Sequence, residues 1–316
     1  MNSLIIKAIT TTLGSCSFIL IFAIAFSFFG KYHWLFDLCS HFRLQYLVCS
    51  LPLIIALYFL KRPKPLIALL LLTLINAGLL IPHYRIQTPS HNESATSRSA
   101  VLLNVNTQLG SPSRVEAFIL KTAPDFIILE EINEQWIQSI PRILSGYPHH
   151  CIRARNDNFG IGLFSKHPLS HKEIIHLGEA QFPSISASID FGSTQLNVIA
   201  THTLPPKNGK YSYLRNDQLQ KLAIYASSKD TPIVLLGDLN TTQFSFHFNE
   251  FLKQSKLSDS STNNGILSTW PSFASALGIQ IDHFLHSNDI IVTDGFIGPK
   301  TGSDHLPLVV HFQIQK

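Results

Sequence analysis

The 316-residue sequence predicts a mixed α/β domain that follows three membrane-spanning helices. Two observations support this prediction. Long apolar runs fill only the first third of the chain, whereas short apolar runs alternate with amphipathic helical patterns after residue 100. We therefore expect a membrane domain at residues 1–85, a polar Ser-, Thr- and Pro-containing linker at 86–99, and one globular domain at 100–316.

The membrane domain contains three apolar runs of about 17 residues each, at 13–29, 44–60 and 66–81. A helix of this length spans roughly 26 Å, just enough to cross the hydrocarbon core of a bilayer. A cleaved signal peptide is the alternative for the first run, and a buried helical hairpin is the alternative for the other two. The length of the first run and the closeness of the second favour a multi-pass membrane protein.

Basic residues beside the apolar runs predict the orientation. The turn at residues 61–65 (KRPKP) holds three cations, which favours the cytoplasmic side. With three spans, the globular domain then lies outside the cytoplasm. Lys31, Arg43 and Arg85 oppose this orientation, because they fall on the outer side.

The net charge of +4 belongs to the membrane-proximal part. Of 24 Lys and Arg residues, eight lie in residues 1–99, which leaves 16; of 20 Asp and Glu residues, two lie there, which leaves 18. The globular domain is therefore close to −2. This value argues against a broad basic surface for nucleic acid.

Short apolar runs rich in Ile, Val, Leu and Phe predict buried strands at 101–105, 126–129, 161–164, 196–200, 233–236, 281–285 and 306–312. Helical patterns lie between some of them, at 113–122, 214–226 and 246–255. In the first, Ser113 is the expected N-cap and Glu116 completes a capping box. The alternation of short strands and helices predicts a mixed α/β domain.

Polar residues mark the ends of these predicted strands. We expect them to converge on one edge of the packed strands, because binding crevices in α/β sheets form at the carboxyl ends of strands. Acid, amide and imidazole groups together suit a metal ion and a phosphate. The residues are Asn104, Asn106, Glu130, Glu131, His202, Asp238, Asn240, Asp282, His283, Asp304 and His305.

The series resembles the endonuclease/exonuclease/phosphatase superfamily, which has the DNase I-like fold. Seven segments carry the resemblance in the family's order: LNVN at 103–106, PDFIILEE at 124–131, GIGLFS at 160–165, THT at 201–203, GDLN at 237–240, IDH at 281–283 and GSDH at 302–305. The resemblance implies a four-layer αββα sandwich of two mostly antiparallel sheets. The TWP segment at 269–271 and the apolar helices look like the membrane-anchored bacterial branch, which implies the bacterial plasma (inner) membrane.

The resemblance also implies a metal-dependent phosphoesterase. Glu131 and Asn104 are the expected ligands of Mg²⁺, with Mn²⁺ or Ca²⁺ as alternatives, and Asp304 assists directly or through water. Glu130 is expected at the surface. Zinc is disfavoured, because the domain lacks His-x-x-His and paired-Cys spacings.

The expected catalytic residues follow from the same motifs. Asp238 orients or deprotonates the attacking water, and Asn240 holds water and phosphate in line. His305 contacts the scissile phosphate, with Asp282 orienting its imidazole. His202 supports the phosphate or the leaving group.

Two further residues are candidates for substrate binding. Asn106 stands where some family members have Asp, so it keeps a polar group without the charge. Arg215 is either a bidentate phosphate clamp or a surface residue of its helix. The aromatic residues Trp270 and Phe273 either enter the membrane interface or cap the core.

Three functions fit these residues. The first is a membrane-anchored phosphoesterase that hydrolyses a phosphodiester or phosphomonoester by in-line attack of water. The second is a nuclease acting on DNA or RNA, and the third is a non-catalytic binding or signalling protein that retains the fold. The polar residues of the mechanism are all present, which favours an enzyme. The expected partners are a phosphate-ester substrate (a lipid headgroup, nucleotide or nucleic acid) and the lipid bilayer, with no obligate protein partner.

Overall fold

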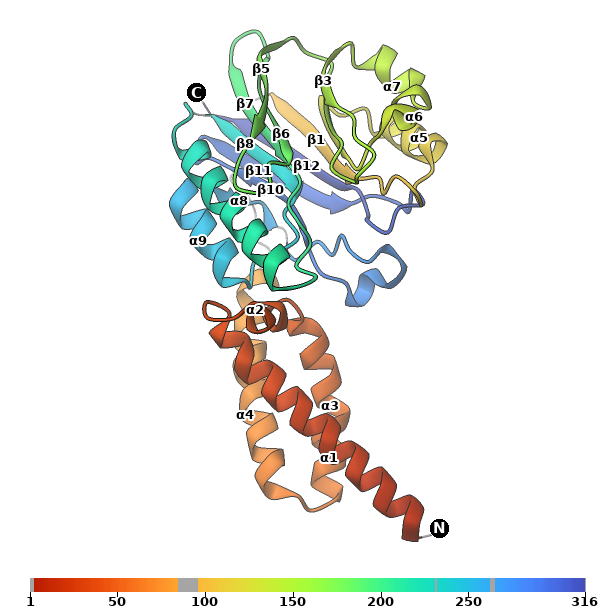
Figure 1. The fold of residues 1–316 in the computed structure, drawn as a ribbon, viewed down its shortest axis with the longest axis vertical. Coiled ribbons are helices and arrows are strands. Elements are labelled where there is room, and N and C mark those ends of the chain that lie inside the picture. Colours follow the sequence, from red (N-terminus) through yellow and green to blue (C-terminus); the bar gives the residue numbers. More distant parts are fainter. Residues whose placement is uncertain (1–2, 85–95, 231, 262–264, 316) are drawn as a thin grey trace. The chain divides into compact units, whose positions relative to one another are not determined.

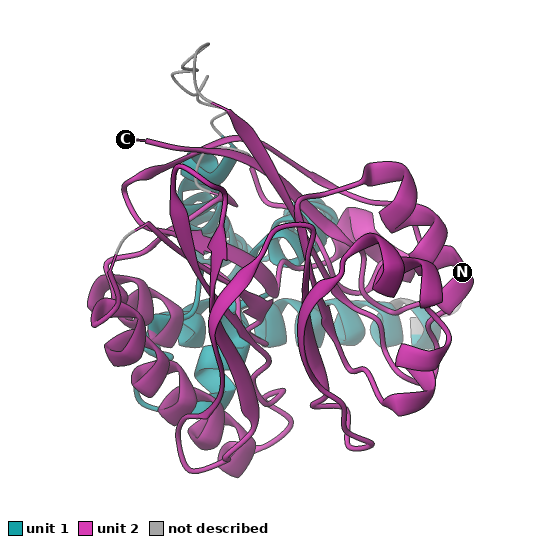
Figure 2. Cartoon of the chain, turned by 90° about the horizontal axis from the view of Figure 1, so that it is seen from above, with its two compact units in different colours: residues 1–84, 244–246 teal, residues 85–243, 247–316 magenta. Residues whose placement is uncertain are grey.

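The computed structural model describes residues 3–84, 96–230, 232–261 and 265–315. The chain forms two compact units (Figure 2). The first consists of residues 1–84 with 244–246, and the second of residues 85–243 with 247–316. Strand β1 (Ser97–Asn104) begins three residues before the expected start of the globular domain. Most of the expected linker, through residue 95, lies outside the described residues.

The first unit is helical. It contains α1 (Ser3–Phe26), α2 (Trp34–Ser40), α3 (Arg43–Phe59) and α4 (Pro63–Leu80), with short 3₁₀ turns at Ser27–Phe29 and Ile81–Tyr84. Two of its segments, Lys7–Phe29 and Pro63–Tyr84, are long and apolar enough to cross a membrane. A third span results if α2 and α3, which meet at 74°, are taken together.

The structure differs from the predicted three single-helix spans at α3. This helix has 17 residues, so at roughly 26 Å it lies at the lower limit of the length that crosses a hydrocarbon core, and it is a candidate span only together with α2. A few apolar side chains, Leu20, Ile24, Leu57 and Leu69, form the interior of the unit. Many others point outward, including Phe18 at 62% exposure and Phe59 at 76%. Such an apolar exterior is typical of helices that face lipid.

The second unit contains two six-stranded sheets (Figure 1). The first has the order β11-β12-β1-β2-β4-β3, and the second has the order β5-β6-β7-β8-β10-β9. Only β1 with β2 and β7 with β8 pair in parallel among the described strands. The remaining strands are β2 (Phe126–Glu130), β3 (His149–Arg153), β4 (Ile161–Ser165), β5 (Leu169–His176), β6 (Pro183–Asp190), β7 (Gln195–Thr201), β8 (Ile233–Asp238), β9 (Ser258–Asp259), β10 (Asp282–His286), β11 (Ile290–Ile297) and β12 (Leu308–Ile314).

Alternation along the strands builds the layers. In β2, Phe126 and Ile128 enter the core between the sheets, while Ile127 and Leu129 face the helices on the other side. The first sheet packs against α5 (Pro112–Thr122), α6 (Glu134–Gln138) and α7 (Pro141–Gly146). The second packs against α8 (Gly209–Ser227) and α9 (Phe246–Ser255). The predicted four-layer αββα sandwich is therefore confirmed.

The seven predicted strands are all present, but five others were not predicted. Strand β6 illustrates the reason, because its inward-facing Ile and Ala residues alternate with Ser184, Ser186 and Ser188, so no continuous apolar run forms. The predicted capping box of α5 is wrong. The helix begins at Pro112, and Glu116 Oε1 instead accepts the backbone N–H of Arg142, 2.7 Å away, at the start of α7.

Candidate active site

Polar side chains from both sheets meet at one end of the sandwich. Parallel strands contribute their carboxyl ends: Asn104 ends β1 and Asp238 ends β8. Antiparallel strands contribute their amino ends, since Asp282 begins β10 and His305 precedes β12. The expectation that the polar groups converge from the carboxyl ends of strands is thus wrong for these two. Asp282 lies directly opposite Asp238 in the β8–β10 pair, because the ladder places their Cα atoms in register.

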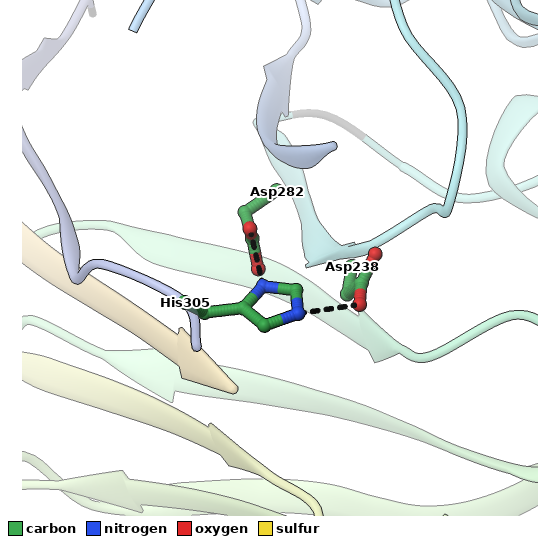
Figure 3. A group of neighbouring side chains, drawn as sticks. All are labelled: Asp238, Asp282 and His305. Atoms are coloured by element: carbon green, nitrogen blue, oxygen red, sulfur yellow. Dashed lines mark hydrogen bonds and ion pairs between the residues drawn. The ribbon is translucent and has the colours of Figure 1, made fainter. Parts of the chain in front are cut away.

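Asp282, His305 and Asp238 form one chain of contacts (Figure 3). His305 Nδ1 lies 2.9 Å from Asp282 Oδ2, and His305 Nε2 lies 3.6 Å from Asp238 Oδ2. All three side chains are buried. Their ligand atoms lie close enough together to hold a metal ion. The imidazole nevertheless sits between two carboxylates, so we interpret the group as a charge-paired histidine.

The electrostatics support this interpretation. Burial lowers the pKa of His305, but the charges of Asp282 and Asp238 outweigh it and raise the pKa to about 10. Burial raises the pKa of Asp282, but the charge and hydrogen bond of His305 outweigh it and leave the pKa below its ordinary value. For Asp238, burial prevails over the attraction of His305 and raises the pKa. His305 is therefore an imidazolium at neutral pH, held by Asp282.

His202 follows β7 and is buried beside the same carboxylate. Its Nε2 lies 3.5 Å from Asp238 Oδ2 and 3.4 Å from Asn240 Nδ2. Burial and then the positive charge of His305 lower the pKa of His202 to about 4. His202 is therefore neutral at pH 7, and the site contains one charged and one neutral imidazole around Asp238.

The turn after β8 is fixed by several hydrogen bonds. The Asn240 backbone N–H donates to Asp238 Oδ1 at 2.9 Å, and Asn240 Nδ2 donates to the Thr203 carbonyl at 2.9 Å. Asn240 has a φ of 48°, the left-handed region that Asn tolerates better than most residues. Its amide group is thereby held next to Asp238.

Arg215, in α8, lies inside the domain. Its side chain is fully buried, and Nη1 donates to the Asn240 carbonyl at 3.0 Å. Nε and Nη2 donate to Asn216 Oδ1. The surface position considered for this residue is wrong. The guanidinium reaches the site through the Asn240 backbone, which suits a positioning role better than a direct clamp on phosphate.

Glu131 offers an oxygen donor of the kind expected for a hard cation, and Asn104 lies beside it with its Oδ1 accepting the backbone N–H of Asn106 at 3.0 Å. Asn104 Nδ2 donates to Glu131 Oε1 at 3.0 Å and to Asp238 Oδ2 at 3.3 Å. Glu131 Oε2 is buried and has no hydrogen-bond partner among the described residues. Burial raises the pKa of Glu131 more than the Asn104 hydrogen bond lowers it. A carboxylate oxygen left unpaired in this position fits a divalent cation, which would repay its desolvation.

Asp304 is held from two sides. Its Oδ1 accepts from Asn106 Nδ2 at 2.7 Å, and its Oδ2 accepts from Trp270 Nε1 at 3.1 Å. Trp270 therefore belongs to the surroundings of the site. Phe273, in the 3₁₀ segment Ser272–Leu277, is 80% exposed, so the alternative in which it caps the core is wrong.

Glu130 is the residue that the sequence interpretation misplaced. It is fully buried, and its Oε2 and Oε1 accept the backbone N–H of Asp238 at 3.0 and 3.3 Å. Burial, then the charges of Asp238 and Asp282, raise its pKa well above the ordinary value. The alternation of β2 carried the missed signal, because Glu130 follows Phe126 and Ile128 on the face toward the second sheet.

Comparisons with known proteins identify the family and the fold. A sequence model of the endonuclease/exonuclease/phosphatase family matches residues 101–305. No curated protein matches the chain. The endonuclease/exonuclease/phosphatase of Beutenbergia cavernae is similar in structure, with 17% identity, a TM-score of 0.59, and coverage of 69% of this chain and 72% of that protein. The endonuclease/exonuclease/phosphatase of Bacteroides vulgatus is also similar, with 16% identity and a TM-score of 0.59. The match covers 70% of this chain and 100% of that protein.

A third solved structure is a mutant beta toxin of Staphylococcus aureus with bound magnesium ions. It shares 15% identity and has a TM-score of 0.52, with coverage of 70% of this chain and all of that one. At these identities the three likenesses show a common fold.

Proposed function

Because the chain belongs to the endonuclease/exonuclease/phosphatase family, we propose that it is a membrane-anchored, metal-dependent phosphoesterase. The observation that carries this proposal is the buried His305 imidazole between Asp282 and Asp238. Such a group offers a fixed positive charge to a phosphate oxygen, beside a carboxylate that can accept a proton from water. The proposed reaction is hydrolysis of a phosphodiester or phosphomonoester by in-line attack of water.

Each residue then has a role set by its surroundings. Asp238, whose pKa burial raises, accepts the proton of the attacking water. Asn240, held by the Thr203 carbonyl, positions the water and the phosphate. The imidazolium of His305 stabilises the negative charge on the phosphoryl oxygens. His202 is neutral and supports the leaving group.

We propose that Glu131 and Asn104 hold the cation, with Asp304 and Asn106 at its edge. Mg²⁺ is the favoured ion, since carboxylate and amide oxygens are its usual protein ligands, and Mn²⁺ or Ca²⁺ could replace it. When bound, the ion supplies polarisation of a phosphate oxygen and offsets its negative charge. The unpaired Glu131 Oε2 supports this assignment.

A phosphate ester of a lipid headgroup is the substrate class that we favour. The helical unit of the same chain carries two or three candidate membrane spans, so lipid phosphates would be the most concentrated esters near the enzyme. The globular domain is near −2 in charge, which disfavours extended contact with DNA or RNA. A nuclease is the second candidate, and Arg153, Arg155, Lys207 and Lys210 would be its cations.

The test is hydrolysis by the full chain in nanodiscs. Phospholipids, bis(p-nitrophenyl) phosphate, single-stranded DNA, RNA and sugar phosphates are offered with Mg²⁺ and with EDTA. We expect Mg²⁺-dependent release of product that Asp238→Asn reduces roughly 100-fold or more, the range of general base catalysis. Equal activity of wild type and Asp238→Asn on every substrate would overturn the proposal. Cleavage of nucleic acid alone would favour the nuclease.

We also propose that the protein is a multi-pass protein of the bacterial inner membrane whose second unit lies outside the cytoplasm. The basic turn at residues 61–65 supports this orientation. Alkaline phosphatase fused to the C-terminus should be active, whereas green fluorescent protein fused there should stay dark. The opposite pattern would place the site in the cytoplasm.

A further inference from the structure

The backbone N–H of Asp238 is bound by a side chain of the other sheet. Asp238 ends β8 in the second sheet, and the Glu130 carboxylate that accepts its N–H comes from β2 in the first sheet. The Asp238 carbonyl is engaged as well, since it accepts the N–H of Thr203 at 3.1 Å. The main chain of the proposed general base is therefore held on both sides.

Gly237 makes this approach possible. A Cβ atom at Gly237 would lie 1.7 Å from the Thr201 carbonyl oxygen and 3.2 Å from Glu130 Oε1. A side chain there would push β8 away from β7 and meet the Glu130 carboxylate. The glycine of the GDLN segment thus lets the first sheet place a carboxylate against the backbone of the second.

The position is costly for an acid. Glu130 is fully buried, and the carboxylates of Glu131, Asp238 and Asp282 are its neighbours. Burying a carboxyl group among other carboxyl groups is unfavourable, so a purely structural role would be served at least as well by an apolar side chain that fills the same space. Among the described residues, the hydrogen bonds of the Glu130 side chain are the two with the Asp238 amide, which indicates what the carboxyl group does there.

We propose that Glu130 is a positioning residue, which holds the backbone of Asp238 so that its carboxylate faces the attacking water. This inference rests on the proposed role of Asp238 as general base. Glu130 does not touch substrate; it acts through the Asp238 amide. Any group that keeps an acceptor oxygen at this point preserves the function, and removal of the acceptor misplaces the base by a fraction of an ångström or more.

The test compares three variants of the full chain in nanodiscs, with bis(p-nitrophenyl) phosphate and Mg²⁺ as the probe. Glu130→Gln keeps an acceptor oxygen, and Glu130→Met removes it at similar length. Ile128→Val trims a neighbouring inward residue of β2 without touching Asp238, so it reports the effect of a weaker core alone. Hydrogen exchange of the Asp238 amide is measured in each variant.

We expect Glu130→Met to lower kcat roughly 10- to 100-fold with KM within about threefold, because small misplacements of reacting groups cost rates of this order. The Asp238 amide should exchange faster in this variant, while the amides of Leu235 and Leu236 keep their protection. Glu130→Gln and Ile128→Val should retain kcat within about threefold of wild type. This rescue by the conservative variant separates positioning from folding.

An unchanged kcat in Glu130→Met, or unchanged exchange of the Asp238 amide, would overturn the inference. So would an equal loss of kcat in Glu130→Met and Ile128→Val, since the loss would then follow core packing. If the wild type and Asp238→Asn are both inactive on every substrate, the proposed function fails instead. The exchange measurement would still decide whether Glu130 holds the Asp238 amide.

Discussion

His305 donates from Nδ1 to Asp282 across 2.9 Å, and this bond turns the opposite ring nitrogen toward Asp238 at 3.6 Å. The pairing fixes both the orientation and the charge of the imidazole. It joins a residue that precedes β12 of the first sheet to the first residue of β10 in the second. The site therefore depends on an ion pair between the two sheets.

Asp282→Asn should weaken the imidazolium. The charge of Asp282 raises the pKa of His305, so its removal lowers that pKa from about 10 and brings deprotonation to a lower pH. We expect kcat to fall roughly 10- to 100-fold, as for other partners of catalytic histidines, and the alkaline limb of the kcat–pH profile to move to lower pH. Asp259→Asn, which alters another carboxylate–histidine pair, should leave that limb in place. An unmoved limb in Asp282→Asn would contradict the assignment.

Glu131→Gln should weaken cation binding. The variant keeps the size of the side chain and removes one negative charge from an oxygen that has no other described partner. The Mg²⁺ dissociation constant, measured by isothermal titration calorimetry, should rise roughly 10- to 100-fold, the range seen when groups that support a metal are lost. Glu134→Gln is the matched control, because Glu134 is exposed at the start of α6. Equal Mg²⁺ affinity in the two variants would remove Glu131 from the metal site.

Arg215→Met distinguishes positioning from a phosphate clamp. Loss of the hydrogen bond to the Asn240 carbonyl leaves a buried acceptor less well satisfied, which costs about 1 to 3 kcal/mol in the free energy of unfolding. In a positioning role kcat falls and KM stays nearly constant. A direct clamp would instead raise KM and leave Asn240 undisturbed. Lys221→Met, at an exposed position of the same helix, should change neither quantity.

The buried His283–Asp259 pair predicts a pH-dependent stability. His283 Nδ1 lies 3.1 Å from Asp259 Oδ2, and Nε2 lies 3.0 Å from the Thr241 carbonyl. Burial lowers the pKa of His283, but Asp259 outweighs burial and raises it above 6.5. Burial raises the pKa of Asp259, but the charge and the hydrogen bond of His283 outweigh burial and lower this pKa below 3.8. The pair therefore stabilises the folded state fully between pH 3.8 and pH 6.5, the ordinary pKa values of the two groups. This stabilisation fades as pH rises through the raised pKa of His283 or falls through the lowered pKa of Asp259.

The corresponding measurement is the Tm of wild type and His283→Gln between pH 5 and pH 9. The Tm of wild type should exceed that of His283→Gln most near pH 5, and the difference should shrink toward pH 9. Near pH 5 it should correspond to about 3 kcal/mol in the free energy of unfolding, the cost of breaking a buried pair. His171→Gln, at an exposed position, is the control. A difference that grows with pH would contradict the sign of the His283 pKa shift.

The sequence was sufficient to predict the polar residues at either end of the strands, because Asp, Asn or His beside an apolar run marks those positions. Asp282, His305 and Asp238 meet in the structure as the motif order suggested. The buried roles of Glu130 and Arg215 were not predictable in the same way. Each is defined by a backbone group distant in sequence, Asp238 for Glu130 and Asn240 for Arg215. Such contacts depend on how the layers pack.

The unpredicted strands have a similar explanation. Among the described strands, β5 pairs only with β6, and it has exposed polar residues such as His171, Lys172 and Glu173, so it lacks an apolar run. Its place in the sheet comes from pairing with β6. The third candidate span also depends on geometry that composition does not contain, the 74° bend between α2 and α3.

The depth of the charged groups determines how the protein responds to its ionic surroundings. Asp238, Asp282 and His305 are each no more than 5% exposed. Screening acts on exposed charges and much less on buried ones. Added salt will therefore alter how a charged substrate arrives at the site, while the attraction within the buried group remains the same. In the proposed enzyme, the interactions within this buried group would therefore stay constant when the salinity around the second unit changes.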